Sequence, residues 1–330
     1  MPCFHPVKCW RYTLPCGPNL NRPIVHAQDF EHAMSKRQYP VPLAETVRPC
    51  SQCVGCRLEK ARQTAMRCVH EASLHSQNCF LTLTYCEGSL PSDRSITYEH
   101  MRDFWKRFRD RFDYPKIKYY SAGEYGTKFF RPHYHACLFG FDFPDKFYYK
   151  TSEAGSKLYA SPLLDEIWGK GNCDIGDVTF ESAAYVARYT LSKRYGNDAD
   201  NYYSRLGVRP EDSWCSQGLG KEWFERYSGD CYPKDWVTLR GMKMRPPKYY
   251  DNLLLKYDPE LLADLKASRE AVGKLNKSGI NFDIRHEFEY VSRTCPVDGV
   301  TREGYVPVRK AVSELVLDAS LRSGRVDFER

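Results

Sequence analysis

The sequence predicts an α+β fold with a central antiparallel sheet flanked by helices. Between residues 55 and 195, short strand-like segments rich in β-branched and aromatic residues alternate with amphipathic helical segments. Two of the strand-like segments follow each other across a short polar turn that contains glycine, as in an antiparallel hairpin. The resulting order is helix, strand, helix, hairpin, helix, strand, helix, which indicates the α+β class.

The length of 330 residues predicts about two domains, or one domain with a sizeable appendage. We expect a cysteine-rich N-terminal segment over residues 1–56 that a metal holds in place, and a folded core over residues 57–196. Residues 197–330 are expected to form a basic and aromatic C-terminal extension that contains helices. The sequence has no internal repeat and no low-complexity segment.

The first half of the chain has a clear periodicity after residue 50. Residues 1–50 contain several prolines and no sustained period, so we expect them to be irregular. Apolar residues at three- and four-residue steps predict helices over residues 50–74 and 98–112. The second helix carries the apolar stripe Met101, Phe104, Trp105, Phe108 and Phe112. Between these helices, we expect a strand over residues 80–85 and a loop over residues 88–93.

The next segments complete the predicted sheet. Residues 117–125 and 132–141 are expected to form the hairpin, and residues 174–180 a further strand. Short helices are expected over residues 162–168 and 182–195, the latter ended by Gly196. Asp258 and Pro259 are typical of the first positions of a helix, which we expect to reach about residue 275. Val312, Leu315, Val316 and Ala319 predict a last helix.

Composition excludes some classes of protein. Lys and Arg exceed Asp and Glu by 49 − 42 = 7, a mild basic excess that is compatible with nucleic-acid binding but does not prove it. No apolar stretch approaches the roughly 20 residues that a spanning helix needs, so we expect no membrane protein. The first residues lack the apolar core of a signal peptide, so we do not expect secretion.

His133 and His135 lie two residues apart in an expected strand, so their side chains point to the same face. If the hairpin turn is centred between residues 128 and 129, Glu124 lies opposite His133. Two imidazoles and a carboxylate would then leave open coordination positions on a metal. This set suits Mg²⁺ or Mn²⁺ bound together with a phosphate, although zinc would also bind. The alternative is a chance histidine pair on a solvated strand beside a surface carboxylate.

Tyr185, Tyr189 and Lys193 are spaced four residues apart, so they share one face of the expected helix. Arg188 lies beside them. In a chain with 24 tyrosines this spacing also occurs by chance. Two half-buried core tyrosines next to a solvated lysine are therefore the alternative interpretation.

The chain has 14 cysteines, and without a signal peptide clustered cysteines indicate a metal or free thiols before disulfides. Cys50, Cys53 and Cys56 have the spacing of metal ligands and suggest a structural zinc. Cys3 is our first choice for the fourth ligand, ahead of His5, Cys9, Cys16 and Cys68. Bacterial ferredoxins share this spacing, but their nearby fourth Cys-Pro is missing here. Free thiols at a helix start are the other alternative.

The order of these segments resembles the HUH endonucleases, which initiate rolling-circle replication. A Phe-Leu-Thr-Leu-Thr-Tyr strand is followed by His-x-His and then by a helix with two tyrosines, as in the two-tyrosine branch. Further segments resemble the replication initiators of gokushoviruses, a group of microviruses, over about residues 1–225. They are residues 1–6, 50–57, 123–126, 131–135, 185–193 and 218–223.

The resemblance implies an HUH core and a metal-dependent DNA nickase and strand transferase. Glu124, His133 and His135 would hold Mg²⁺ or Mn²⁺, and Tyr185 or Tyr189 would attack the scissile phosphate of phage origin DNA. Cleavage would leave a 5′-phosphotyrosine and a 3′-OH for synthesis, and the second tyrosine would allow religation of the displaced single strand. Lys193 takes the place of the lysine that two-tyrosine motifs often carry one residue earlier.

The same resemblance implies action in the cytoplasm of a bacterial host, on origin DNA and single-stranded DNA. The sequence has no Walker-type P-loop, so a host helicase is expected to separate the strands and a host polymerase to extend the 3′-OH. Basic residues Lys106, Arg107 and Arg109 would line the DNA path or form a solvated helix face.

Three other functions remain open from the sequence. A plasmid initiator or relaxase of the same fold would use the same chemistry on another replicon. A non-catalytic zinc-containing nucleic-acid-binding protein would bind zinc without nicking. A metal-dependent oxygenase would use iron on two histidines and a carboxylate, but it gives the tyrosine and lysine helix no role.

Overall fold

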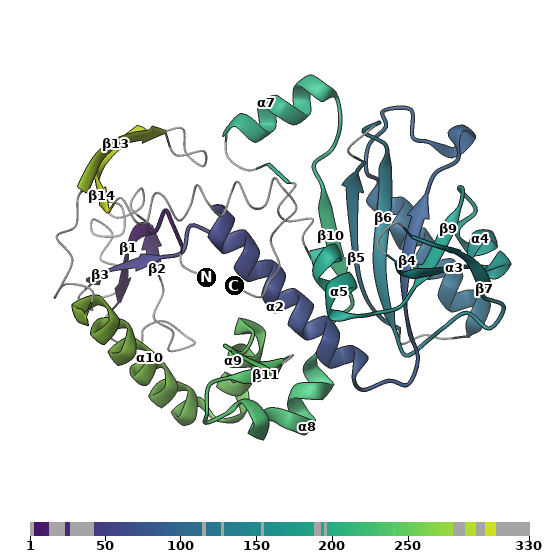
Figure 1. Ribbon diagram of the computed structural model, residues 1–330. Coiled ribbons are helices and arrows are strands. Elements are labelled where there is room, and N and C mark those ends of the chain that lie inside the picture. Colours follow the sequence, from purple (N-terminus) through teal and green to yellow (C-terminus); the bar gives the residue numbers. More distant parts are fainter. Residues whose placement is uncertain are drawn as a thin grey trace. The chain divides into compact units, whose positions relative to one another are not determined.

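Figure 1 shows the computed structural model of the chain. It describes residues 3–12, 24–26, 43–113, 117–126, 129–152, 155–187, 193–194, 197–239, 241–279, 288–294 and 301–307. The chain divides into two compact units. The first contains Met1–Glu59, Phe288–Val291 and Gly304–Arg330, and the second contains Lys60–Glu287 and Ser292–Glu303.

The first unit contains a three-stranded antiparallel sheet. Strand β1 (Val7–Tyr12) lies between β2 (Ile24–His26) and β3 (Leu43–Arg48). The expectation that residues 1–50 are irregular is therefore wrong for these segments. Each strand has six residues or fewer, which is too short for a sustained period to be recognised in the sequence. Helix α2 (Val54–Ala72) follows, close to the predicted bounds.

A seven-stranded sheet dominates the second unit, and all its pairs are antiparallel, as the sequence predicts. The strand order is β10-β5-β6-β4-β9-β8-β7. The strands are β4 (Asn78–Thr84), β5 (Lys118–Tyr125), β6 (Pro132–Phe139), β7 (Phe147–Thr151), β8 (Lys157–Ala160), β9 (Cys173–Gly176) and β10 (Asp212–Cys215).

Three of these strands, β7, β8 and β10, do not follow from the sequence pattern. Every residue of β7 is exposed, and β10 has no buried residue, so neither shows the alternation of a half-buried strand. The expected strand over residues 174–180 is shorter, because the chain enters helix α5 (Phe180–Ala187) at its end. The Thr179 hydroxyl accepts from the Ser182 amide at 3.1 Å and the Ser182 hydroxyl from the Thr179 amide at 2.8 Å, a capping box that starts the helix.

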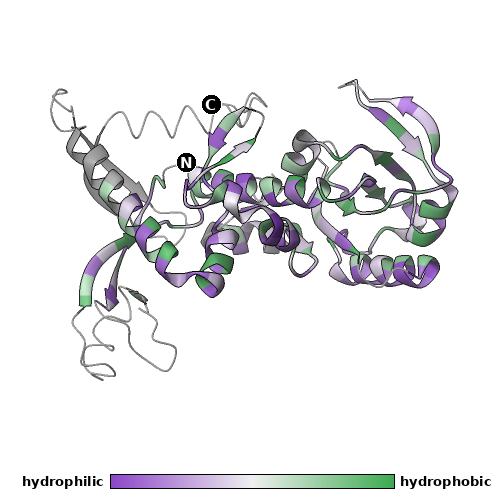
Figure 2. Ribbon diagram, turned by 90° about the horizontal axis from the view of Figure 1, so that it is seen from below, coloured by the Kyte–Doolittle hydropathy of each residue, from purple (hydrophilic) through white to green (hydrophobic). Residues whose placement is uncertain are grey.

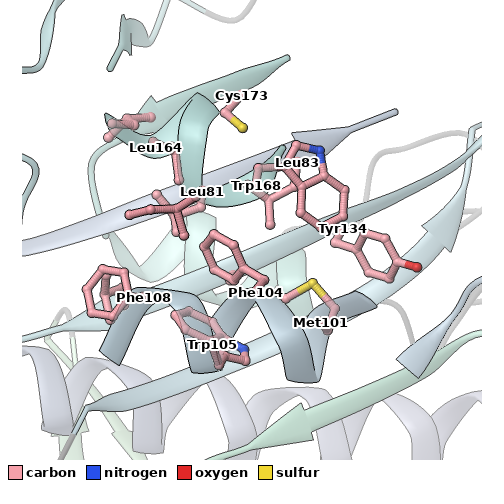
Figure 3. Packing of buried hydrophobic residues seen from close by; sticks show 14 of the residues in the cluster. Leu81, Leu83, Met101, Phe104, Trp105, Phe108, Tyr134, Leu164, Trp168 and Cys173 are labelled. Atoms are coloured by element: carbon pink, nitrogen blue, oxygen red, sulfur yellow. The ribbon is translucent and has the colours of Figure 1, made fainter. Parts of the chain in front are cut away.

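Helices α3 (Tyr98–Phe112) and α4 (Pro162–Trp168) have the predicted bounds and cover one face of the sheet. The predicted apolar stripe of α3 packs against Leu81 and Leu83 of β4. Figure 3 shows the rings of Phe104, Trp105 and Phe108 on the same side of the sheet as these leucines. Burial of such large apolar side chains contributes about 1.5–3 kcal/mol each. A short 3₁₀ turn, η2 (Glu87–Ser89), lies in the expected loop.

Arg107 of α3 has a structural contact of its own. Its guanidinium donates to the carbonyl oxygens of Ile167 at 2.7 Å and Trp168 at 3.0 Å, at the end of α4. Because the last carbonyls of a helix lack partners within the helix, this contact caps α4. Lys106 is exposed beside it.

Helices after the sheet form a second apolar core in this unit. The core contains Met66 of α2 together with Trp223, Tyr250 and Leu262. These helices are α8 (Lys221–Cys231), α9 (Lys248–Tyr257) and α10 (Pro259–Gly279), and a small hairpin joins β11 (Val237–Leu239) to β12 (Met242–Met244). Helix α7 (Asn197–Leu206) precedes β10, and none of its described side chains belongs to this core.

The predicted helix after Asp258 corresponds to α10, and the Asp258 carboxylate accepts from the Leu261 amide at 2.9 Å, as an N-cap does. Strands β13 (Phe288–Thr294) and β14 (Thr301–Pro307) pair with each other. The expected last helix lies outside the described residues.

Figure 2 shows hydrophobic and hydrophilic residues mixed along the helices and strands, as expected where one side of each element covers a core. Among the described residues, no helix is both long enough and apolar enough to cross a membrane.

Candidate active site

The β5–β6 hairpin brings Glu124, His133 and His135 together. Glu124 pairs directly with His133 across the hairpin, which confirms the predicted register. The Glu124 Oε1 atom lies 3.2 Å from His133 Nε2 and 3.1 Å from His135 Nε2. The two imidazole rings are nearly perpendicular, with centroids 4.9 Å apart. One carboxylate oxygen therefore faces both imidazoles on one side of the sheet.

Tyr134, between the two histidines, fixes which face they occupy. Its side chain is fully buried on the opposite face, where its hydroxyl accepts from the Thr97 amide at 2.8 Å and lies 2.9 Å from the Tyr85 hydroxyl. Gly123 lies opposite Tyr134, and a Cβ there would lie 2.6 Å from Ile96 Cγ2. A register shift of one residue would put the histidines into the core, so this packing specifies the position of the site.

Neighbouring groups orient both imidazoles. His133 Nδ1 lies 3.3 Å from the carbonyl oxygen of Arg131, which can only accept, so Nδ1 carries the proton in that contact. His135 Nδ1 lies 3.1 Å from the Thr82 hydroxyl of β4. Both contacts leave Nε2 directed toward Glu124. Outer contacts of this kind orient metal-binding histidines in proteins.

The electrostatics of the site favour an ionised carboxylate and a neutral histidine. Burial opposes ionisation of Glu124, but the nearby imidazoles of His133 and His135 outweigh it, so the pKa of Glu124 is well below its usual value. Burial lowers the pKa of His135, and Glu124 only partly offsets this effect. At neutral pH, the carboxylate and the imidazole of His135 are therefore in the protonation states that bind a cation.

This donor set fits a divalent metal. The three side chains offer one ligand atom each, and these atoms lie within 4.8 Å of one another. Among the described residues, His135 Nε2 is a buried nitrogen without a well-directed hydrogen bond, although the Glu124 oxygen is close. A buried polar atom without a directed partner is costly, and a metal would satisfy it.

Tyr185 of α5 points its hydroxyl at this group of ligands. The hydroxyl donates to Glu124 Oε1 at 3.0 Å. Its ring lies edge-on to the His135 ring, with centroids 5.0 Å apart. The side chain remains 46% exposed, so the hydroxyl reaches the site while the residue is open to solvent. Helix α5 lies against β5 and β6, which explains this approach.

Of the other three residues singled out in the predicted tyrosine helix, the structure describes only one. Tyr189 and Arg188 lie outside the described residues. Lys193 is described and is part-buried.

Phe80 and Thr82 contact the site but were not predicted. Phe80 stacks on His135 at 5.6 Å and meets the Tyr185 ring edge-on at 6.5 Å, and Thr82 orients His135. They are the outward positions of β4, between buried Cys79, Leu81 and Leu83. The alternation was visible in the sequence, but pairing with the histidine strand was not.

A second group of ligands lies in the first unit. The Cys3, Cys50, Cys53 and Cys56 sulfurs lie within 4.8 Å of one another, so the structure brings the favoured fourth cysteine to the other three. The Cys50 amide donates to Cys3 Sγ at 3.2 Å, and the Cys53 amide to Cys50 Sγ at 3.2 Å. Burial opposes ionisation of Cys53, but amides of Cys56 and Phe4 donate to its sulfur and help lower its pKa to about 7. A thiolate stabilised by amides is a good metal ligand.

Cys53→Ser is expected to remove one tightly bound zinc per chain and to destabilise the first unit. Metal binding free energy, about 10–16 kcal/mol for structural zinc, becomes folding free energy when the site forms only in the folded state. Elemental analysis and thermal unfolding with and without a chelator measure both effects. Cys215→Ser, which changes an exposed cysteine outside the cluster, is the control. Purified protein with neither zinc nor iron would rule the site out.

Comparison with known proteins identifies relatives. The family model for replication-associated protein ORF2/G2P matches residues 78–194, which contain the hairpin and α5. Replication-associated protein VP4 of Bdellovibrio phage phiMH2K is 33% identical over 269 residues, covering 79% of each chain. Replication-associated protein ORF2 of Spiroplasma virus 4 is 34% identical over 240 residues, covering 68% of this chain and 74% of the relative.

Replication-associated protein ORF4 of Chlamydia phage 1 is 32% identical over 235 residues, covering 69% of this chain and 57% of the relative. No solved structure matches. The extent of these alignments agrees with the resemblance that the sequence motifs indicate. The chain belongs to the family of phage replication-associated proteins, as a gokushovirus-type replication initiator.

Proposed function

We propose that the chain is an HUH-type endonuclease that nicks phage origin DNA and later religates the displaced strand. The observation that carries this proposal is the contact of the Tyr185 hydroxyl with Glu124, the same carboxylate that faces both histidines. A tyrosine with only a packing role is expected to be buried, whereas Tyr185 is nearly half exposed and its hydroxyl contacts a group of candidate metal ligands.

Glu124, His133 and His135 would hold the divalent metal, Mg²⁺ or Mn²⁺. When bound, such a metal polarises the scissile phosphate and stabilises its developing negative charge. The second group of ligands, Cys3, Cys50, Cys53 and Cys56, would hold a structural zinc. Its all-sulfur composition suits zinc, whereas the mixed nitrogen and oxygen set suits Mg²⁺ or Mn²⁺.

The proposed reaction is a transesterification at phosphorus. The Tyr185 oxygen forms a bond to phosphorus, and the bond from phosphorus to the 3′ oxygen breaks. The phenolic proton leaves tyrosine, and the 3′ oxygen takes up a proton to become the 3′-OH. The 5′-phosphotyrosine keeps the energy of the broken bond, so attack by a 3′-OH reverses the reaction and religates the strand without hydrolysis.

The remaining parts of the proposal follow from the same chemistry. Tyr189, four residues after Tyr185 in the sequence, would be the second nucleophile, and Lys193 would provide a positive charge near the phosphate. The substrate would be single-stranded and origin DNA in the cytoplasm of the bacterial host, with a host helicase and a host polymerase as partners.

Incubation of the full chain with single-stranded origin DNA and Mn²⁺ tests the proposal. We expect a covalent protein–DNA band on a denaturing gel, together with a free 3′-OH that a polymerase can extend. EDTA should abolish both products. Zinc-containing protein that binds this DNA but forms neither product would show that it is a non-catalytic nucleic-acid-binding protein.

A further inference from the structure

We propose that strand β7, at the edge of the large sheet, stacks the bases of single-stranded DNA that leaves the candidate active site. This inference rests on the proposed function for the identity of its ligand. Phe147, Tyr148 and Tyr149 of β7 are 53%, 56% and 58% exposed. Three successive aromatic rings with more than half of their surface in water are unusual, because aromatic side chains are normally buried.

The aromatic residues lie in a basic hairpin. Residues 146–160 contain Lys146, Lys150 and Lys157 against one acidic residue, Glu153, and because Lys146 forms an ion pair with Asp142, we consider only Lys150 and Lys157 as phosphate contacts. Lys150 Nζ lies 4.9 Å from the centre of the Tyr149 ring, and the Lys157 side chain is exposed. Aromatic rings beside cations are the combination with which proteins bind single strands, because rings stack on bases and cations contact phosphates.

Strand pairing connects this hairpin to the candidate active site on one face of the sheet. His135 pairs with Thr82, and Thr82 pairs with Asp174 of β9. Directly paired residues share a face, so Asp174 lies on the face that carries the site. Lys150 Nζ lies 3.7 Å from the Asp174 carboxylate and therefore reaches the same face.

A β-bulge sets which side chains of β7 lie on the active-site face, and Tyr148, which pairs with Tyr159, lies on the opposite face. The register shifts between Tyr148 and Lys150, so that Tyr148 pairs with Tyr159 and Lys150 with Leu158. Tyr159 packs against the core, whereas a Cβ on Gly176 would lie 3.8 Å from Leu158 and 3.9 Å from Phe80 of the active-site face. The bulge therefore places Lys150 on the active-site face and leaves Tyr149 beside it. Bulges commonly redirect side chains in this way.

The distance between the candidate active site and β7 suits a short stretch of single-stranded DNA. Four strand spacings of about 4.8 Å separate β6 from β7 in the sheet order, or about 19 Å. Phe80 and Thr82 of β4 and Asp174 of β9 lie on the face between them and are only part-buried. A strand held at Tyr185 can therefore continue across this face to the rings of Phe147 and Tyr149.

A protein partner is the other occupant to consider, because β7 is an edge strand. Edge strands that bind another strand need free backbone groups without nearby charge, whereas lysines on an edge oppose such pairing. Lys150 lies within β7 and Lys157 pairs with Thr151 at its end. The charges therefore favour a polyanion over an added protein strand.

The experiment measures binding of the full chain to a fluorescein-labelled single-stranded oligonucleotide by anisotropy in EDTA, where cleavage is absent. The double variant Phe147→Ala/Tyr149→Ala is expected to bind at least about 10-fold more weakly, because each stacked base contributes substantially. Tyr149→Phe keeps the ring and should bind as the wild type does. Tyr257→Ala, which removes a 59% exposed tyrosine from α9, is the matched control.

Replacing the lysines is expected to change a different property, the salt dependence of DNA binding. Lys150→Ala/Lys157→Ala should make the salt dependence of binding shallower, by about 0.7 in the logarithmic slope for each lost phosphate contact. At saturating DNA with Mn²⁺, the aromatic double variant should form the covalent adduct at the wild-type rate, because its chemistry is untouched. This second measurement also shows that the variant is folded.

Wild-type DNA affinity in the aromatic double variant would overturn the inference. Size-exclusion chromatography then shows whether this variant has lost self-association. Such a loss would assign β7 to a protein interface. If the wild type forms no adduct but its binding still depends on Phe147 and Tyr149, the proposed function fails and the DNA surface stands. The two hypotheses are thus distinguished by separate readouts.

Discussion

His135→Ala is expected to reduce metal-dependent DNA cleavage by about a thousandfold while leaving the fold in place. The imidazole is buried, and its Nε2 atom lies 3.1 Å from the carboxylate of Glu124. Removing it leaves two protein ligands, and a metal that stabilises charge on the phosphate contributes several kcal/mol to the transition state. His133→Ala is expected to have an effect of similar size, because His133 contacts the same carboxylate oxygen.

A matched control separates loss of a ligand from loss of any histidine beside a glutamate. His75 Nε2 lies 3.4 Å from Glu71 Oε1, outside the site, so His75→Ala should cleave as the wild type does. Isothermal calorimetry with Mn²⁺ should show weaker binding by His135→Ala and His133→Ala but not by His75→Ala, and thermal unfolding in EDTA should show that the variants are folded. Full cleavage by His135→Ala at ordinary Mn²⁺ concentrations would refute the assignment of the metal ligands.

The geometry of the hairpin could be predicted from the sequence because it depends on local rules. Strand parity places His133 and His135 on one face, and a short turn fixes which residue of β5 they meet. Helix α3 was likewise predictable, since its apolar stripe is long and regular. In each case, neighbouring residues along the chain contain the whole signal.

The contacts of β4 with the site could not be predicted, because they depend on pairing between segments far apart in the sequence. Thr82 lies 53 positions before His135, yet its hydroxyl orients that imidazole. The sequence predicts a strand over residues 80–85, but the sheet order β5-β6-β4 has no local signal. The edge strand β7 could not be predicted either, because a fully exposed strand has no alternation of buried and exposed residues.

Cys3 illustrates an intermediate case. Its distance of 47 positions from Cys50 gives no geometric information, and His5, Cys9, Cys16 and Cys68 were also possible ligands. Strand β1 pairs antiparallel with β3, with Val7 opposite Arg48. This pairing brings the residues just before β1 beside those just after β3, so Cys3 meets Cys50. The choice depended on a three-stranded sheet that the sequence pattern did not reveal.

The double variant Tyr185→Phe/Tyr189→Phe is expected to form no covalent adduct with origin DNA, whereas each single variant should retain some. The four-residue spacing in the sequence predicts that the two tyrosines share a helix face about 6 Å apart, so either hydroxyl could reach one phosphate after a small rotation. Phenylalanine keeps the ring of Tyr185 edge-on to His135 and Phe80 and removes only the oxygen that contacts Glu124. Packing therefore changes little, and the variants test the nucleophile itself.

Mass spectrometry of the digested adduct identifies which tyrosine carries the DNA, and a denaturing gel gives its amount. Tyr227→Phe is the matched control, because Tyr227, at the kink within α8, is 43% exposed, close to the 46% of Tyr185. This variant should form as much adduct as the wild type. DNA attached to a tyrosine other than Tyr185 or Tyr189, or adduct in the double variant, would mean that α5 only supports the site. The contact of Tyr185 with Glu124 would then serve to hold the carboxylate in place, and the nucleophile would have to come from another segment.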